Sequence, residues 1–315
     1  MAKRLLFVCI GLVSMTLRGS AQQDPQFSQY MFNTIYYNPA FSGVEGLTKI
    51  TALHRSQWLG YTPTYGDGGA PTTQLITFTT PIYKLNSGFG GYIDHDNLGP
   101  YNNLEAQASY AYHIGIKNSK LSLGLRAGIL SQTINSNYFR AVDYESFLSG
   151  GAQSQIKPDL AFGAYWQSEK FYFGASFNHL THATFTFGQS IRNPLQTHSY
   201  ITAGYTYEVN FDLKFKFSTL VQTDFTTTTV NVGALAYLKD TMWGGLSFRQ
   251  GDAAVLMLGY SFLKDKSLKL GYSLDYIVKD QAAKQPTSQE IMLMYELPTH
   301  IGPGKKVVRT PRYRH

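Results

Sequence analysis

Between residues 47 and 297 the chain is a series of about fourteen stretches in which apolar residues alternate with small or polar ones. The clearest spans 269–278, where Leu270 and Leu274 share one face and Ser273 lies on the other. Successive side chains of a strand point to opposite faces, so each stretch has one apolar and one polar side. Each stretch is also close to the roughly 9–11 residues that a tilted strand needs to cross a bilayer.

Closing these strands into a cylinder, apolar side outward, leaves no strand edge unpaired, and a membrane tolerates no other β arrangement. The pattern therefore predicts an all-β protein, a transmembrane antiparallel β-barrel of about 14 strands in the outer membrane. The strands are expected near residues 47–58, 72–80, 87–95, 102–114, 120–132, 158–167, 170–179, 197–208, 213–224, 228–238, 241–250, 253–263, 267–278 and 288–297. Short turns follow the even-numbered strands and longer loops follow many odd-numbered ones, which predicts that both termini are periplasmic.

The composition excludes an ordinary cytosolic enzyme. Charged residues make up only 15% of the chain, against about 25% in soluble domains. The 23 Tyr and 20 Phe are a supply suited to aromatic girdles at two membrane interfaces. A soluble β-sandwich or β-helix also alternates, but its strands would be shorter and richer in outward charge.

The chain divides into four segments. Residues 1–21 are typical of a signal peptide, because Lys3 and Arg4 precede an apolar core and small residues precede a cleavage site after Ala21. Residues 22–46 do not alternate and are rich in aromatic and amide side chains. The barrel follows at 47–297, and a basic tail occupies 298–315.

The excess positive charge belongs to the two ends of the chain. The formal net charge is +7, but three basic residues of the leader and five of the tail leave −1 for everything between them. A nucleic-acid-binding protein would spread basic residues over a folded face, so no nucleic-acid partner is expected. The lone Cys9 lies in the leader, so the mature chain is expected to form no disulfide.

Residues 22–46 are a candidate functional segment, because their aromatic side chains would be exposed to water unless they pack against the barrel or a partner. A barrel of about fourteen strands leaves interior space that something must fill. The segment is expected either to plug the periplasmic mouth or to lie on its rim and bind a partner. The residues expected to do this are Phe27, Tyr30, Phe32, Asn38, Pro39 and Phe41.

The basic tail is a second candidate for partner binding. Pro303, Gly304 and Pro311 oppose helices and sheet ladders, so an extended peptide is expected. It either docks on a periplasmic partner or is a solvated end near lipid headgroups. The residues expected to dock are Lys305, Lys306, Arg309, Arg312, Tyr313 and Arg314.

No catalytic, cofactor or metal site is expected. His179, His182 and His198 surround one predicted external loop, where a solvated loop is favoured over a metal site. Residues 94–105 match part of a calcium loop, but Leu98 replaces an oxygen ligand and a polar hairpin is favoured. The lumen-facing charges are expected to pair across neighbouring strands: Glu105, Arg126, Lys214, Lys216 and Asp275.

Several segments resemble those of the PorP/SprF family of outer-membrane proteins, which serve the type IX secretion system of Bacteroidetes. They are residues 24–33 (DPQFSQYMFN), 38–43 (NPAFSG), 54–58 (HRSQW), 97–100 (NLGP), 110–113 (YAYH), 157–160 (KPDL) and 174–180 (GASFNHL). The resemblance implies a non-enzymatic role in protein export or gliding motility. The implied partners are the periplasmic ring, peptidoglycan-associated components or secreted cargo. The alternative is a channel for hydrophobic small molecules resembling the FadL family.

Overall fold

The computed structural model describes residues 24–61, 69–138, 151–187, 191–279, 285–297, 300–301 and 305–306. Its strands are β1 (Thr48–Ser56), β2 (Thr72–Ile82), β3 (Ser87–Leu98), β4 (Tyr101–Ile116), β5 (Ser119–Asn135), β6 (Ala152–Gln167), β7 (Phe171–Asn178), β8 (Thr184–Phe187), β9 (Ile191–Pro194), β10 (His198–Glu208), β11 (Leu213–Thr223), β12 (Thr228–Leu238), β13 (Met242–Arg249), β14 (Ala253–Phe262), β15 (Leu268–Ile277), β16 (Thr287–Leu297), β17 (His300–Ile301) and β18 (Lys305–Lys306). Its helices are short: η1 (Tyr30–Phe32), α2 (Thr34–Tyr37), η2 (Pro39–Phe41), η3 (Tyr83–Leu85) and η4 (Ser136–Tyr138).

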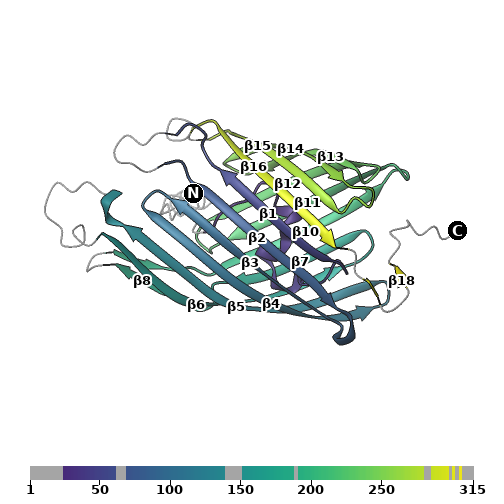
Figure 1. The fold of residues 1–315 in the computed structure, drawn as a ribbon, viewed down its shortest axis with the longest axis horizontal. Helices are drawn as coiled ribbons and strands as arrows, with labels where there is room; N and C mark the ends of the chain where they lie inside the picture. Colours follow the sequence, from purple (N-terminus) through teal and green to yellow (C-terminus); the bar gives the residue numbers. More distant parts are fainter. Residues whose placement is uncertain are drawn as a thin grey trace, which may run out of the picture.

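Fourteen of the strands form one closed antiparallel barrel (Figure 1). Each pairs with the next along the chain, except that β7 pairs with β10 and the β8–β9 hairpin is left out of the wall. The barrel closes between β1 and β16, where Thr48 faces Leu297 and Ser56 faces Gln289. The predicted fold and strand number are confirmed.

The strands divide their side chains between bilayer and lumen as the alternation predicts. In β14, for example, Val255 and Met257 are buried while Leu256 and Leu258 are exposed. Exposed apolar residues are therefore the outward face of a membrane barrel rather than a soluble surface. Within the described residues, no helix has the length and apolar character needed to cross a membrane.

The largest departures from the predicted strands are at the start of β6 and between β7 and β10. β6 begins at Ala152, six residues before the predicted start at 158, and pairs there with Asn135 of β5. The β8–β9 hairpin was not predicted. Its Phe185 and Phe187 pack on Leu130 and Ile134 of β5. The hairpin therefore covers the part of β5 that pairs with the early start of β6.

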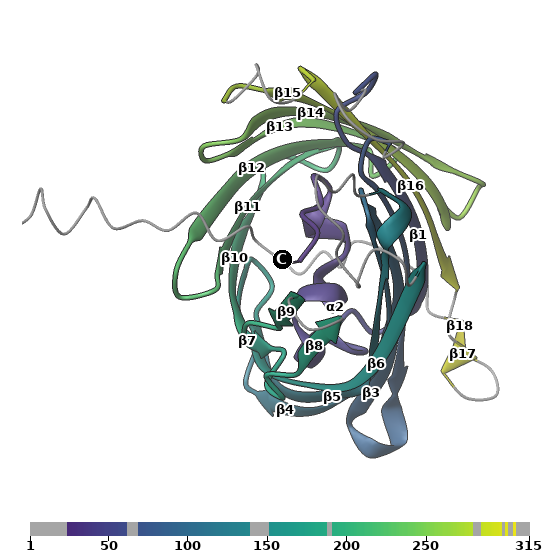
Figure 2. The ribbon, with the colours of Figure 1, turned by 90° about the vertical axis from the view of Figure 1, so that its left-hand side faces the viewer.

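Residues 24–46, which we call the lumen segment, lie inside the barrel. Figure 2 shows them in purple, winding through the bore as α2 and short turns. The segment begins in the half nearer the long loops, where Asp24 contacts the residues that flank the β8–β9 excursion. It ends at the short-turn end, where β1 starts. The segment therefore extends through both halves of the lumen, whereas the sequence predicted a position at the periplasmic mouth or on its rim.

Two predicted segments lie largely outside the described residues. None of the leader 1–21 is described. In the tail, β17 and β18 pair with each other, with His300 facing Lys306 and Ile301 facing Lys305. The extended peptide expected for the tail is therefore not observed at Lys305 and Lys306, which pair with His300 and Ile301. Arg309, Arg312, Tyr313 and Arg314 lie outside the described residues.

Candidate functional site

One end of the lumen segment is held by buried charges, which we call the ionic anchor: Ser28 together with Arg55, Arg249, Asp275 and Glu290. The Ser28 hydroxyl donates to the Asp275 carboxylate at 2.6 Å. It accepts from Arg55 Nη1 at 2.7 Å and from Arg249 Nη2 at 3.1 Å. The backbone N–H groups of Ser28 and Gln29 each donate to Glu290 at 2.9 Å.

The ionic anchor joins the segment to strands on both sides of the barrel closure. Arg55 comes from β1 and Glu290 from β16, and the two residues face each other in register. Arg55 also pairs with Asp275 of β15 at 2.8 Å. The four wall side chains are at most 2% exposed. Buried charges are tolerated only when paired and hydrogen-bonded, so the segment completes a network that the barrel wall alone leaves unfinished.

The other end of the segment lies against a row of small residues, which we call the small-residue row: Gly88, Ala111, Gly124, Gly163 and Ser176. These residues face one another in register across β3, β4, β5, β6 and β7. A Cβ on Gly88 would lie 2.1 Å from Ser42 O, and one on Gly124 would lie 2.3 Å from Ala40 N. The backbone of the segment therefore touches the wall where side chains are missing.

Asn38 and Pro39 shape the segment at this contact. The Asn38 amide donates to the Ala164 carbonyl at 2.9 Å and, through Oδ1, accepts from Ala40 N at 2.9 Å. It thereby caps η2, and Pro39 follows at the first helical position, which it favours. Ser176 Oγ of the row donates to the Tyr37 carbonyl at 2.8 Å.

Between the two contacts the segment buries aromatic rings against the wall. Phe27, Tyr36 and Tyr37 pack edge-on or tilted against each other, and then against Tyr92 and Tyr200 of the wall. Arg126 lies over the Tyr92 ring at 4.8 Å. Its Nη1 donates to the Tyr36 carbonyl at 2.7 Å. The segment is therefore packed like a protein core inside the lumen.

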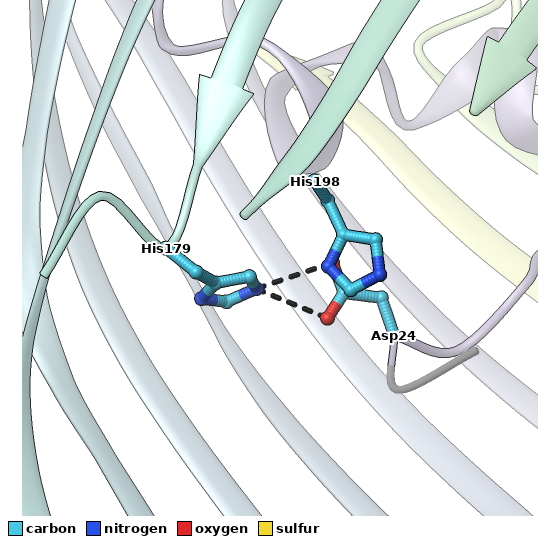
Figure 3. A group of neighbouring side chains, drawn as sticks. All are labelled: Asp24, His179 and His198. Carbon is cyan, nitrogen blue, oxygen red and sulfur yellow. Dashed lines mark hydrogen bonds and ion pairs between the residues drawn. The ribbon is translucent and has the colours of Figure 1, made fainter. Parts of the chain in front are cut away.

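The first described residue of the segment lies between two histidines (Figure 3). Asp24 Oδ1 is 3.0 Å from His179 Nε2, and Asp24 Oδ2 is 3.3 Å from His198 Nδ1. The Tyr200 hydroxyl donates to the same carboxylate. Burial opposes ionisation of Asp24, but the two imidazoles hold the pKa of this carboxyl well below its usual range.

A cavity of about 710 Å³ remains beside the segment at the short-turn end. Most of its lining side chains are aromatic or charged. The aromatic lining residues are Phe32, Phe41, Tyr165, Tyr172, Phe217, Tyr237 and Trp243. The charged lining residues are Lys49, Lys214, Lys216, Lys264, Lys266 and Lys269 with Glu45, Asp240, Asp265 and Glu296. We call this space the mouth cavity.

The residues proposed from the sequence for residues 22–46 all lie in the lumen. Phe27, Tyr30 and Phe41 are buried, as are Asn38 and Pro39. The Tyr30 hydroxyl donates to the Ser218 carbonyl at 3.0 Å. Phe32 packs on Trp243, and Phe41 packs on Tyr165. These three contacts are all made with residues of the barrel wall from inside the lumen.

The expected cross-strand pairing of the lumen-facing charges holds only in part. Asp275 of β15 pairs across strands as expected, with Arg55 of β1 and Arg249 of β13. Cross-strand pairing does not describe Arg126, which donates to backbone carbonyls of the segment. Lys214 pairs with Asp240 of a neighbouring turn, Lys216 lies over the Tyr237 ring, and Glu105 accepts from Tyr92.

The solvated-loop expectation is wrong for two of the three histidines. His179 and His198 are at most 2% exposed, and only His182 is exposed. The polar hairpin expected over residues 94–105 is reduced to a turn at Gly99-Pro100, because Asp94 and Asp96 belong to β3 and are buried. Asp94 faces Glu105 in the ladder.

Comparison with known proteins gives one family. The model of the type IX secretion system membrane protein PorP/SprF family matches residues 19–295. No match is found among curated proteins.

Similar solved structures include a Pseudomonas aeruginosa FadL homologue, with 13% identity, 87% of this chain and 94% of that chain covered, and a TM-score of 0.48. A second is the CymD monoaromatic hydrocarbon channel, with 13% identity, 90% of this chain and 95% of that chain covered, and a TM-score of 0.49. A third is the Pseudomonas putida toluene transporter TodX, with 9% identity, 86% of this chain and 95% of that chain covered, and a TM-score of 0.47. Since the family match spans most of the sequence, the chain belongs to the PorP/SprF family of type IX secretion system membrane proteins.

Proposed function

We propose that this protein is a closed, non-enzymatic barrel of the type IX secretion system that binds other proteins instead of conducting solutes. One observation carries the proposal: the lumen segment is fixed at both ends, by the ionic anchor and by the small-residue row. A segment held by buried charges and by backbone contact does not leave the bore at low cost. The filled bore then has a structural role only, and partner proteins bind to the surfaces at the ends of the barrel.

The mouth cavity is the surface best suited to a protein partner. It opens at the short-turn end, which in outer-membrane barrels is the periplasmic end. Its lining carries six lysines against four carboxylates, beside aromatic rings. Lysines and aromatic rings together suit an acidic segment with apolar side chains, supplied by periplasmic machinery or by secreted cargo. The basic tail would give the same partner a second contact from residues 298–315.

The experiment is a detergent pull-down of the tagged barrel from its native membrane, followed by mass spectrometry and a secretion assay. K214E/K216E should reduce recovery of secretion-ring or cargo proteins while the barrel still inserts. Lys117 lies on the β4–β5 turn outside the mouth cavity, so K117E is the matched control. Equal partner recovery by both variants would contradict the proposed docking surface.

A hydrophobic-solute channel is the second candidate, and one observation favours it. Met31, Phe32, Tyr165 and Trp243 give the mouth cavity an apolar wall large enough for a small ligand. The discriminating result is a stoichiometric fatty acid or aromatic compound extracted from the purified barrel, with no protein partner recovered. That outcome would replace the docking proposal with transport.

A further inference from the structure

The Asp24 cluster has a donor set and geometry that the ionic anchor lacks. Asp24, His179 and His198 each offer one ligand atom, and all three atoms lie within 4.8 Å of one another. The two carboxylate–imidazole distances are 3.0 and 3.3 Å. Ligands on a tetrahedral zinc ion with bonds of roughly 2.0–2.1 Å are about 3.3 Å apart. The three residues therefore surround a point at which one ion fits.

His179 is oriented as metal-bound histidines are. Its Nδ1 lies 3.0 Å from Asp159 Oδ2, so the N–H on this side is given to a buried carboxylate. Nε2 is directed at the Asp24 carboxylate, as Figure 3 shows. A carboxylate that fixes the tautomer of a ligand histidine is the usual outer support of a zinc site. His179 also has a left-handed backbone, with φ 59°, which is uncommon for a residue other than glycine.

His198 supplies a separate observation. The ring is 0% exposed, and among the described residues neither of its nitrogens has a hydrogen-bond partner. Nδ1 is near the Asp24 carboxylate but misaligned for a hydrogen bond. Buried polar atoms are nearly always satisfied, so each exception calls for an explanation. A metal ion between the imidazole and the carboxylate would satisfy one of the two nitrogens.

The local charge balance favours a cation. Among the described residues, five carboxylates line this part of the lumen beside the Arg126 guanidinium, which already binds the lumen segment. The five residues are Asp24, Asp94, Asp96, Glu105 and Asp159. Gln107 links Glu105 to Asp159, which shows that they share one polar wall. Buried carboxylates in such excess are either protonated or balanced by a cation, and a bound metal ion supplies that cation.

We propose that Asp24, His179 and His198 bind one divalent transition-metal ion of the zinc type, with Asp159 supporting His179. Asp24 belongs to the lumen segment, while His179 follows β7 and His198 begins β10. The ion would therefore fasten the start of the segment to the wall below the β8–β9 hairpin. It adds a third attachment to the two that the proposed function rests on, but does not depend on that function.

The test is metal binding by the mature full-length barrel in detergent, stripped with a chelator and titrated with Zn²⁺ or Co²⁺. One ion per chain is expected, with the Co²⁺ absorption of a low-coordinate site. D24N, H179Q and H198Q should lose the ion. D159N should weaken binding by about 10–100-fold, the usual effect of removing an outer support. H182Q is the matched control on the same loop and should bind as the unchanged protein does.

Three results would overturn the proposal. The first is no Zn²⁺ or Co²⁺ bound at micromolar concentration, which leaves a buried ionic network only. The second is unchanged binding in D24N and both histidine variants. The third is loss of the ion in E105Q with retention in D24N, because Glu105, Asp159 and His179 form the neighbouring donor group. If a histidine variant fails to insert, D24N decides, since it preserves the shape of the side chain.

Discussion

The two ends of the lumen segment are held by opposite kinds of interaction. At Ser28 the wall presents four buried charged side chains, and the segment adds a hydroxyl and two N–H groups to them. At residues 38–43 the wall presents almost nothing, and the backbone fills the space left by glycines. The ionic anchor depends on which groups are present, whereas the small-residue row depends on which groups are absent. The ionic anchor should therefore be weakened by substitutions that remove groups, and the small-residue row by substitutions that add atoms.

The largest effect is expected at the ionic anchor. R55A leaves Asp275 and Glu290 with Arg249 as their remaining buried cation, and breaking a buried pair costs about 3–5 kcal/mol. The free energy of unfolding, measured by urea titration in detergent micelles, should fall by that amount. Arg192 in β9 is exposed, so R192A is the control and should stay within about 0.5 kcal/mol. A loss under 1 kcal/mol for R55A would show that the anchor contributes little.

A smaller loss is expected from the segment side of the same anchor. S28A removes a hydroxyl that bonds charged groups but leaves the ion pairs of the wall in place, so the expected loss is that of one hydrogen bond to a charged group, about 1.5–3 kcal/mol. The same urea titration measures it. Ser119 lies at the β4–β5 turn with an exposed hydrogen bond, so S119A provides a control. Equal effects of S28A and S119A would contradict burial of the network.

At the small-residue row the effect comes from adding atoms. G124A places a methyl group 2.3 Å from Ala40 N, and overpacking of this kind costs about 1–3 kcal/mol. Gly115 in β4 has no atom within 4 Å of an added Cβ, so G115A is the control. Limited proteolysis should also cut the lumen segment faster in G124A than in G115A. Equal cutting of both would mean that the segment moves aside freely.

The smallest effect is the coupling between the two ends, which is measured against the coupling within one end. S28A and R55A both lie in the ionic anchor and share partners, so the double mutant should depart from additivity by about 0.5–3 kcal/mol. S28A and G124A share none, and their effects should add within about 0.3–0.5 kcal/mol. Strong coupling between Ser28 and Gly124 would show that the two ends form one unit.

The sequence predicts the barrel better than its interior. Alternation is local, so the fourteen strands can be recognised from neighbouring residues alone. Arg55 and Glu290 meet only because β1 closes on β16 in one register. Likewise, Gly88, Gly124 and Gly163 form a row only once three registers are known. Asp24 and His198 meet because the lumen segment enters the bore. The path of this segment cannot be predicted from the pattern of neighbouring residues.

The most direct test of the central claim is conductance in planar bilayers. The account predicts that the intact barrel gives no large steady conductance, because residues 24–46 fill the bore. Deletion of residues 24–41 should give large, steady steps, since the wall of fourteen strands then encloses water. A deletion variant that inserts and stays closed, or an intact barrel that conducts equally well, would contradict the account.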